Sequence, residues 1–249
     1  MIVLKSKEEI ELMATAAEVT AHMLEELPGV IVPGMSTKDI DTWCENYILK
    51  HNMVPAFKGY GGFPATACVS VNEEVVHGIP SKRRILEEGD IVSVDLGTIY
   101  KGFYSDAART YPVGNISEED AKLIRVTEQS FFEGLKFCRA GNRLGDVSHA
   151  IQTYAESFGF SVVRDFVGHG VGRNLHEDPQ IPNYGRANHG PKLVPGMVLA
   201  IEPMIAAGDY DVEVLSNDWT AVTIDRSNAA HYENTVVITE DEPRLLTKL

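Results

Sequence analysis

Two aspartates follow apolar stretches of the chain, where charged side chains are unusual. Asp95 lies in the segment Ile91–Gly97, and Asp106 lies in the segment Phe103–Arg109. These segments predict two strands joined by a tight turn near Tyr100-Lys101, so a symmetric hairpin would set the two carboxylates directly opposite each other. Like charges on facing residues are destabilising. A shared proton or a metal ion would relieve the repulsion, whereas a frayed hairpin would leave two solvated surface acids.

A second pair of acids repeats this arrangement at longer range. Glu202 follows the apolar segment Met197–Ile201, and Glu233 lies within Ala230–Ile238. Their midpoint is Asn217-Asp218, a dipeptide typical of turns. An extended ribbon that folds back there would bring the two glutamates together.

Four carboxylates would then converge where the two ribbons meet. Four unpaired buried negative charges would cost more free energy than folding supplies. Two divalent cations would balance the four charges. The acids therefore predict a dinuclear metal site.

Three histidines stand in unusual contexts. His169 lies in Gly168-His-Gly-Val-Gly172, and such glycines give the backbone freedom and close approach that binding loops use. His176 follows in a segment that matches neither the P-loop, nor GxGxxG, nor HExxH. His77 precedes the turn Gly78-Ile-Pro80, and both His77 and His176 also suit ordinary surface or turn positions. Sequence context singles out none of the other histidines, which are His22, His51, His149, His189 and His231.

Four amphipathic segments predict the helices that position these motifs. Ser6 with Glu9 forms a capping box ahead of the first helix, and Ser36 with Asp39 opens the second. Ser117 begins the third. The predicted ranges are 6–27, 36–48, 117–137 and 144–158.

The second and fourth helices match each other at an offset of 107 residues. At this offset Gly34 meets Gly141, and Leu86–Asp95 aligns with Leu193–Glu202, so that Asp95 meets Glu202. We interpret this repeat as two related α+β halves with antiparallel sheets and flanking helices. No linker-like or low-complexity segment separates the halves, which favours one unit. The predicted domain is 1–249, with halves of about 1–112 and 113–249.

Composition narrows the classes of protein. The chain has 249 residues, 44% of them apolar, and 22 basic against 36 acidic residues give a formal charge of −14. A surface this acidic repels phosphate, so direct nucleic-acid binding is not expected. Three scattered cysteines predict neither a disulfide framework nor a zinc pair, and indicate a reducing compartment. No signal peptide and no apolar run of about 18 residues is seen, which predicts a cytoplasmic protein without a membrane span.

The ordered set of these motifs resembles the type I methionine aminopeptidases across essentially the whole chain. The resemblance implies the pita-bread fold, a pseudo-two-fold α/β structure, and removal of the initiator methionine from nascent proteins, with preference for a small second residue. The motifs that carry it are Asn72–Pro80, Asp95-Leu-Gly97, Ser105-Asp106, Gly168–Gly172, Ile201–Met204 and Tyr232–Thr235.

The resemblance also implies a ligand set for two divalent ions. Asp106 and Glu233 bridge the ions, Asp95 holds one, and His169 with Glu202 holds the other. One nitrogen among many oxygens suits Mn²⁺, Fe²⁺ or Co²⁺, and Zn²⁺ also fits, so the sequence does not identify the metal.

Further roles follow from the same resemblance. Glu202 moves the proton of the attacking water, His176 binds the carbonyl oxygen, and His77 lies at the nitrogen of the bond that is cut. The residues implied for the methionine pocket are Tyr60, Phe63, Cys68, Leu175 and Trp219. Phe57 and Leu175 occupy places that vary in the family, which leaves the fine specificity open. The implied partners are N-termini of nascent polypeptides, with the ribosome as a candidate, and the expected state is a monomer.

Two rival functions remain at the level of sequence. Xaa-Pro aminopeptidases and prolidases share the pita-bread fold, but they generally carry a large additional N-terminal domain for which 249 residues leave no room. A non-catalytic binding protein of the same fold would lack metal ligands, whereas all five implied ligands are present here.

Overall fold

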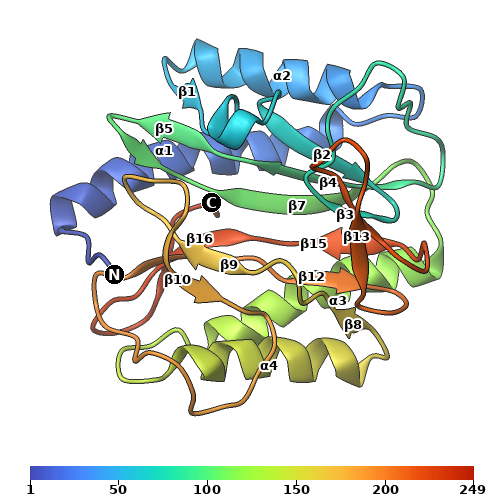
Figure 1. Cartoon of the computed structure of the whole chain (residues 1–249). Helices are drawn as coiled ribbons and strands as arrows, with labels where there is room; N and C mark the ends of the chain where they lie inside the picture. Colours follow the sequence, from blue (N-terminus) through green and yellow to red (C-terminus); the bar gives the residue numbers. More distant parts are fainter.

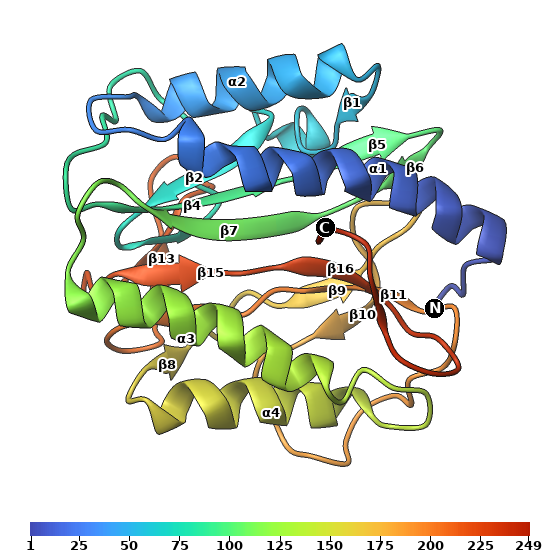
Figure 2. The same ribbon diagram turned by 180° about the vertical axis from the view of Figure 1, so that it is seen from behind.

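Two layers of helices cover opposite faces of the molecule, and the sheets lie between them (Figure 1). The computed structural model describes all residues, 1–249. α1 and α2 cover the first half of the chain, and α3 and α4 cover the second, as the reverse view also shows (Figure 2). No helix is both long enough and apolar enough to cross a bilayer. The helices are α1 (Lys7–Glu26), α2 (Thr37–Lys50), α3 (Glu118–Leu135) and α4 (Leu144–Ser157), with 3₁₀ turns η1 (Leu27–Gly29) and η2 (Tyr60–Gly62).

The helix starts confirm the capping signals of the sequence. The Ser6 hydroxyl accepts a hydrogen bond from the Glu9 N–H, and the Glu9 carboxylate accepts one from the Ser6 N–H. Ser36 and Asp39 make the same box at α2. α3 ends at Leu135, two residues before the predicted end, and the Phe137 N–H donates to the Gly134 carbonyl, an i to i−3 bond typical of a tightened last turn.

The strands form five small sheets. The first half contains the sheet β2-β4-β7, and the second contains β10-β9-β11-β16-β17. Three further sheets, β1-β5-β6, β15-β12-β8 and β13-β14-β3, extend these two. The strand bounds are β1 Val54–Pro55, β2 Ala67–Val71, β3 Glu74–Val76, β4 Ile91–Leu96, β5 Thr98–Tyr100, β6 Phe103–Tyr104, β7 Ala107–Pro112, β8 Ser161–Val162, β9 Gly168–Gly170, β10 Glu177–Ile181, β11 Val198–Ile201, β12 Met204–Ala206, β13 Val212–Val214, β14 Ala221–Thr223, β15 Ala229–His231, β16 Asn234–Val237 and β17 Arg244–Leu245.

The first acidic hairpin has a register different from the predicted one. Asp95 pairs with Ala108 and not with Asp106, because the turn lies at Lys101-Gly102, one residue later than predicted. Both turn residues have positive φ, +47° and +80°, which the tight turn of a twisted hairpin requires and glycine permits. The prediction that Asp95 faces Asp106 directly is therefore wrong. Asp106 instead lies two residues before Ala108, so its side chain is on the same face of the hairpin as that of Asp95, in a diagonal position.

The second acidic ribbon has the predicted register. Ile201 pairs with Asn234, and Met204 pairs with His231, so the intervening Glu202 and Glu233 face each other. The ribbon turns at Asn217-Asp218, where the Asn217 side chain accepts hydrogen bonds from two backbone N–H groups.

The repeat of the sequence is visible in the placement of the elements. α2 and α4 each have 14 residues and begin 107 residues apart, and β4 and β11 begin at the same offset. Each half also has a hydrophobic core of its own, of 19 buried residues in the first half and 13 in the larger cluster of the second.

Threonine hydroxyls join the two halves at a seam between β7 and the strands β15 and β16. The Thr110 hydroxyl bonds both the N–H and the carbonyl of His231, at 2.8 and 2.9 Å. Thr235 does the same to the backbone of Asp106, at 3.2 and 2.8 Å. Between them the Glu233 N–H donates to the Ala108 carbonyl at 2.9 Å. The seam therefore fixes Asp106 and Glu233 side by side.

Candidate metal centre

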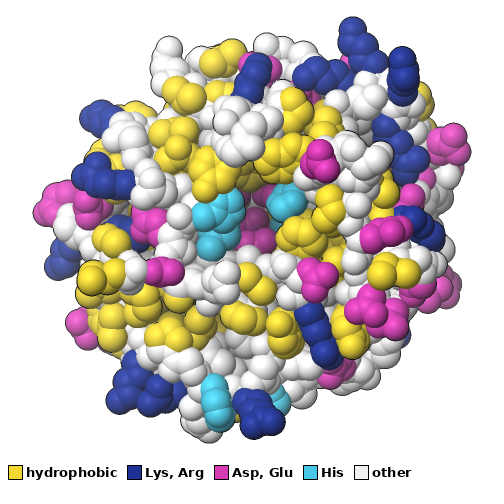
Figure 3. All heavy atoms as spheres, viewed as in Figure 1, with side chains coloured by type: hydrophobic (Ala, Val, Ile, Leu, Met, Phe, Trp, Pro, Cys, Tyr) yellow, Lys and Arg dark blue, Asp and Glu magenta, His cyan; other side chains and the backbone are white.

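A cavity of about 220 Å³ opens at the seam, and all four predicted acids line it. Asp95 comes from β4, Asp106 from the link between β6 and β7, and Glu202 and Glu233 from facing links in the second half. The space-filling view shows histidines and acids inside this hollow, with apolar side chains around its mouth (Figure 3). The structure thus brings together the four carboxylates that the sequence predicted to converge.

His169 reaches the same place from β9, which lies between β10 and β11 in the five-stranded sheet. A Cβ atom added at Gly168 would lie 2.4 Å from the Ala200 carbonyl oxygen, and one at Gly170 would lie 2.2 Å from that of Asp178. The flanking glycines therefore allow the strands to pack closely around the histidine, as the sequence indicated. The His169 Nδ1 donates to the Gly170 carbonyl at 2.9 Å, so its Nε2 is free of hydrogen and faces the acids.

The carboxyl groups of the site are shifted strongly toward the protonated form. Burial raises the pKa of Asp95 to about 7. Burial, followed by repulsion from the neighbouring carboxylates, raises the pKa values of Asp106 and Glu233 well above their usual range. The pKa of Glu202 is raised for the same two reasons. Burial also lowers the pKa of His169 to about 3, so its ring is neutral.

No lysine or arginine forms an ion pair with these acids. Arg109 lies nearby, but its guanidinium donates to the carbonyls of Ala108 and Glu233 and to the Asn234 side chain. Buried oxygen atoms of three acids have no hydrogen-bond partner: Oδ1 of Asp95, Oδ1 of Asp106 and Oε1 of Glu233. Buried polar atoms are normally satisfied, so these atoms indicate a missing positive partner.

The distances also fit a metal ion. The His169 Nε2 lies 3.6 Å from Oδ2 of Asp106 and 3.5 Å from Oε1 of Glu202. Asp106, His169 and Glu233 each offer a ligand atom within 4.8 Å of the others, as do Glu202, His231 and Glu233. Oxygen ligands with one or two imidazoles are the donor set of divalent first-row metals. Asp95 belongs to neither three-residue group, although it lines the same cavity.

His77 and His176 line the cavity outside the metal-binding groups. The His176 Nδ1 is hydrogen-bonded to the Tyr60 hydroxyl at 2.7 Å, and its ring centroid is 4.2 Å from that of His169. His77 has a positive φ of +60° and packs edge-on against Phe166 at 5.3 Å. Burial lowers the pKa of His77 to about 4 and also lowers that of His176. Both rings are therefore neutral at physiological pH.

The predicted methionine-pocket residues form the apolar wall of this cavity. Phe63 and Trp219 pack edge to face at 5.1 Å, and Phe63 and Cys68 belong to one buried cluster. Burial raises the pKa of the Cys68 thiol well above its usual range, which keeps it neutral. The lining also includes Phe166, which the sequence did not single out. The predicted residues found in the wall are Tyr60, Phe63, Cys68, Leu175 and Trp219, together with Phe57.

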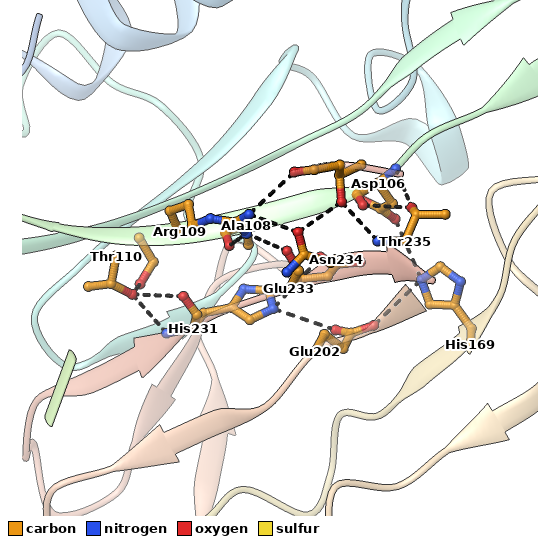
Figure 4. Close-up of polar contacts among 12 residues, drawn as sticks. Asp106, Ala108, Arg109, Thr110, His169, Glu202, His231, Glu233, Asn234 and Thr235 are labelled. Atoms are coloured by element: carbon orange, nitrogen blue, oxygen red, sulfur yellow. Dashed lines mark hydrogen bonds and ion pairs between the residues drawn. The ribbon is translucent and has the colours of Figure 1, made fainter. Parts of the chain in front are cut away.

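Sequence reasoning missed His231. It ends β15, is 1% exposed, and its Nε2 faces Glu202 and Glu233 (Figure 4). A usable signal was present, because His231 stands two residues before Glu233 in an extended segment, and residues at i and i+2 of a strand share one face.

Comparison with known proteins gives the class to which this fold and site belong. The model of metallopeptidase family M24 matches residues 11–240. The methionine aminopeptidase of Clostridium acetobutylicum is 58% identical over 247 residues, which cover 99% of each chain. Methionine aminopeptidase 1 of Bacillus subtilis is 53% identical over 249 residues, which cover the whole of both. The crystal structure of methionine aminopeptidase from Thermotoga maritima superposes with a TM-score of 0.98 at 53% identity, covering 100% of both chains.

The fold and the acid-rich cavity are thus those of a metal-dependent peptidase. This chain belongs to metallopeptidase family M24 and has its pita-bread fold, as the sequence motifs indicated.

Proposed function

We propose that this protein is a methionine aminopeptidase, which hydrolyses the initiator methionine from the N-termini of nascent polypeptides and prefers a small second residue. The observation that carries this proposal is one cavity in which an apolar wall adjoins four carboxyl groups, three of which have a buried oxygen without a hydrogen-bond partner. Full-length relatives at 53–58% identity with the name methionine aminopeptidase support the same activity.

Five residues hold the metal in this proposal. Asp95, Asp106, His169, Glu202 and Glu233 would together hold two divalent ions, with Asp106 and Glu233 shared between them. When bound, the ions supply Lewis acidity that lowers the pKa of a water and polarises the scissile carbonyl.

The surrounding side chains then carry the proton and bind the reacting groups. Glu202 accepts the proton of the attacking water, because its carboxylate lines the cavity beside the other proposed ligands. The Tyr60 hydroxyl and Nδ1 of His176 are hydrogen-bonded, and in the proposed tautomer the hydroxyl is the donor, so that Nε2–H donates to the substrate carbonyl oxygen. His77, held neutral by burial, binds the nitrogen of the bond that is cut.

The apolar wall selects the methionine side chain. Aromatic rings and a neutral thiol offer polarizable surface to a thioether, and their packing leaves a narrow space. The residues in this role are Tyr60, Phe63, Cys68, Leu175 and Trp219.

The cellular setting is part of the same proposal. The chain acts as a monomer in the cytoplasm, with residues 1–249 as one catalytic domain, on polypeptides that emerge from the ribosome. Its formal charge of −14 suits substrates with a free amino group and disfavours direct nucleic-acid binding.

Peptide hydrolysis with controlled metal content tests this function. The chelated protein is assayed on Met-Gly-Met and on an Xaa-Pro peptide, before and after addition of Mn²⁺, Fe²⁺, Co²⁺ or Zn²⁺ singly. We expect no activity without metal, and release of methionine from Met-Gly-Met when metal returns. Cleavage of the Xaa-Pro peptide alone would identify a prolidase, and activity that survives chelation would contradict a metal-dependent mechanism.

A further inference from the structure

His231 points an unpartnered nitrogen into the metal centre. The residue is 1% exposed, and its Nε2 has no hydrogen-bond partner. Nε2 lies 3.8 Å from Oε2 of Glu202 and 3.9 Å from Oε2 of Glu233. In Figure 4 the Glu202 carboxylate lies between His231 on one side and His169 on the other.

These distances are too long for hydrogen bonds, which join nitrogen and oxygen at about 2.7–3.2 Å. They match two ligands of one ion, because metal–nitrogen and metal–oxygen bonds of about 2.0–2.2 Å allow separations up to about 4.4 Å. The two oxygens of Glu202 face different histidines. Oε1 lies 3.5 Å from the His169 Nε2, and Oε2 lies 3.8 Å from the His231 Nε2.

The fold holds the His231 backbone in place. Thr110 bonds both its N–H and its carbonyl, and Met204 pairs with it across the sheet. The ring is therefore attached to a fixed strand end, two residues from Glu233. A buried nitrogen that faces two acids without a hydrogen-bond partner suits a metal ligand.

We propose that Nε2 of His231 is a direct ligand of a divalent ion held with Glu202 and Glu233, so that the centre contains a second imidazole beside His169. This inference rests on the proposed metal site and adds a residue to it. Imidazole suits Zn²⁺, Fe²⁺ and Ni²⁺ better than it suits Mn²⁺. His231 therefore biases this centre toward the later first-row metals.

Anomalous diffraction from crystals of the full chain loaded with Co²⁺ tests the ligand directly. We expect an anomalous peak within about 2.3 Å of the His231 Nε2 and in contact with Glu202 and Glu233. If every peak lies beyond bonding distance of that nitrogen, His231 is not a ligand and the inference is wrong.

Metal affinity in solution gives a second measurement. Competition with a chromophoric chelator yields the Kd for Co²⁺ and Mn²⁺ in the wild type, in His231→Leu, and in His189→Leu as a matched control at an exposed histidine. Loss of an outer hydrogen-bonding partner costs about 10- to 100-fold in affinity, so loss of a ligand should weaken Co²⁺ binding by at least about 100-fold. We expect a smaller loss for Mn²⁺ and no change in His189→Leu. Unchanged Co²⁺ affinity in His231→Leu would contradict the assignment, and if that variant does not fold, the diffraction experiment on the wild type decides.

The two proposals fail separately. A wild type that binds Co²⁺ through His231 without cleaving Met-Gly-Met would contradict the proposed function alone. A wild type that cleaves the peptide while its His231 stays outside bonding distance would contradict only the additional ligand.

Discussion

Asp95 gives the metal-free site a distinct dependence on pH. Burial raises its pKa from 3.8 to about 7, so between these values the folded chain holds a proton that the unfolded chain has lost. This contribution to stability is fully present below pH 3.8 and is lost as the pH rises through 7. A bound cation offsets the free-energy cost of burying the ionised Asp95 carboxylate.

We therefore expect the Tm of the chelated protein to fall between pH 5 and pH 8, and the rise in Tm on adding Co²⁺ to grow over the same range. Scanning fluorimetry across that range measures both, with equal buffer ionic strength as the control. A metal-induced rise that does not change with pH would show that the acids are already ionised without metal.

In the proposed function, His176 and His77 act in catalysis without binding a metal ion. Neither histidine belongs to a metal-binding group, and His176 is held by Tyr60 at 2.7 Å. Loss of a hydrogen-bond donor to a developing oxyanion costs about 100- to 1,000-fold in kcat. We expect His176→Ala to show such a loss on Met-Gly-Met, and His77→Ala to lower kcat as well, with metal content unchanged in both. Elemental analysis of the purified variants checks the metal, and a parallel loss of metal would overturn these roles.

At the scale of elements, Thr235 links β16 to Asp106, one of the proposed metal ligands. Its hydroxyl bonds both backbone groups of Asp106. Thr235→Val keeps the shape but leaves those buried groups unsatisfied, which costs about 1–3 kcal/mol each. We expect a lower denaturation midpoint and weaker Co²⁺ binding. The control is Thr42→Val at an exposed helix position, which should change stability by less than about 0.5 kcal/mol. Equal effects of the two substitutions would show that the hydrogen bonds of Thr235 do not position Asp106 for metal binding.

The elements also show what the sequence could predict and what it could not. Helix starts were predictable because caps are local, as at Ser6 and Ser36. The Asn217-Asp218 turn gave the correct register for the two glutamates because its side chain bonds its own backbone. The predicted register of the Asp95 hairpin was wrong by one turn position, because the turn needs positive φ at two residues and Gly102 adopts it more easily than Tyr100. His231 was missed because its role depends on contacts across the sheet.

At the scale of the whole molecule, the metal centre belongs to both halves. Two aspartates come from the first half and two glutamates from the second, and the seam hydrogen bond from Glu233 to Ala108 runs beside them. Removal of the cations should therefore loosen the seam more than the outer helices.

Hydrogen exchange measures this difference. We expect faster amide exchange in β7, β15 and β16 after chelation, little change in α2, and recovery when Co²⁺ is returned. A uniform increase over the chain would indicate global destabilisation instead.

The reciprocal threonine contacts limit how the two halves can move. Thr110 of the first half is hydrogen-bonded to the backbone of His231, and Thr235 of the second half is hydrogen-bonded to the backbone of Asp106. Opening the seam would break the hydrogen bonds of both threonines, so these contacts oppose separation of the two halves. We therefore expect the groups that line the cavity to be assembled before a peptide arrives, so that little binding energy goes into closure. In the proposed function, a preassembled cavity would reject peptides with a bulky second residue by steric exclusion at its mouth. This preference for small second residues should persist at low temperature, where slow closing motions would otherwise limit turnover.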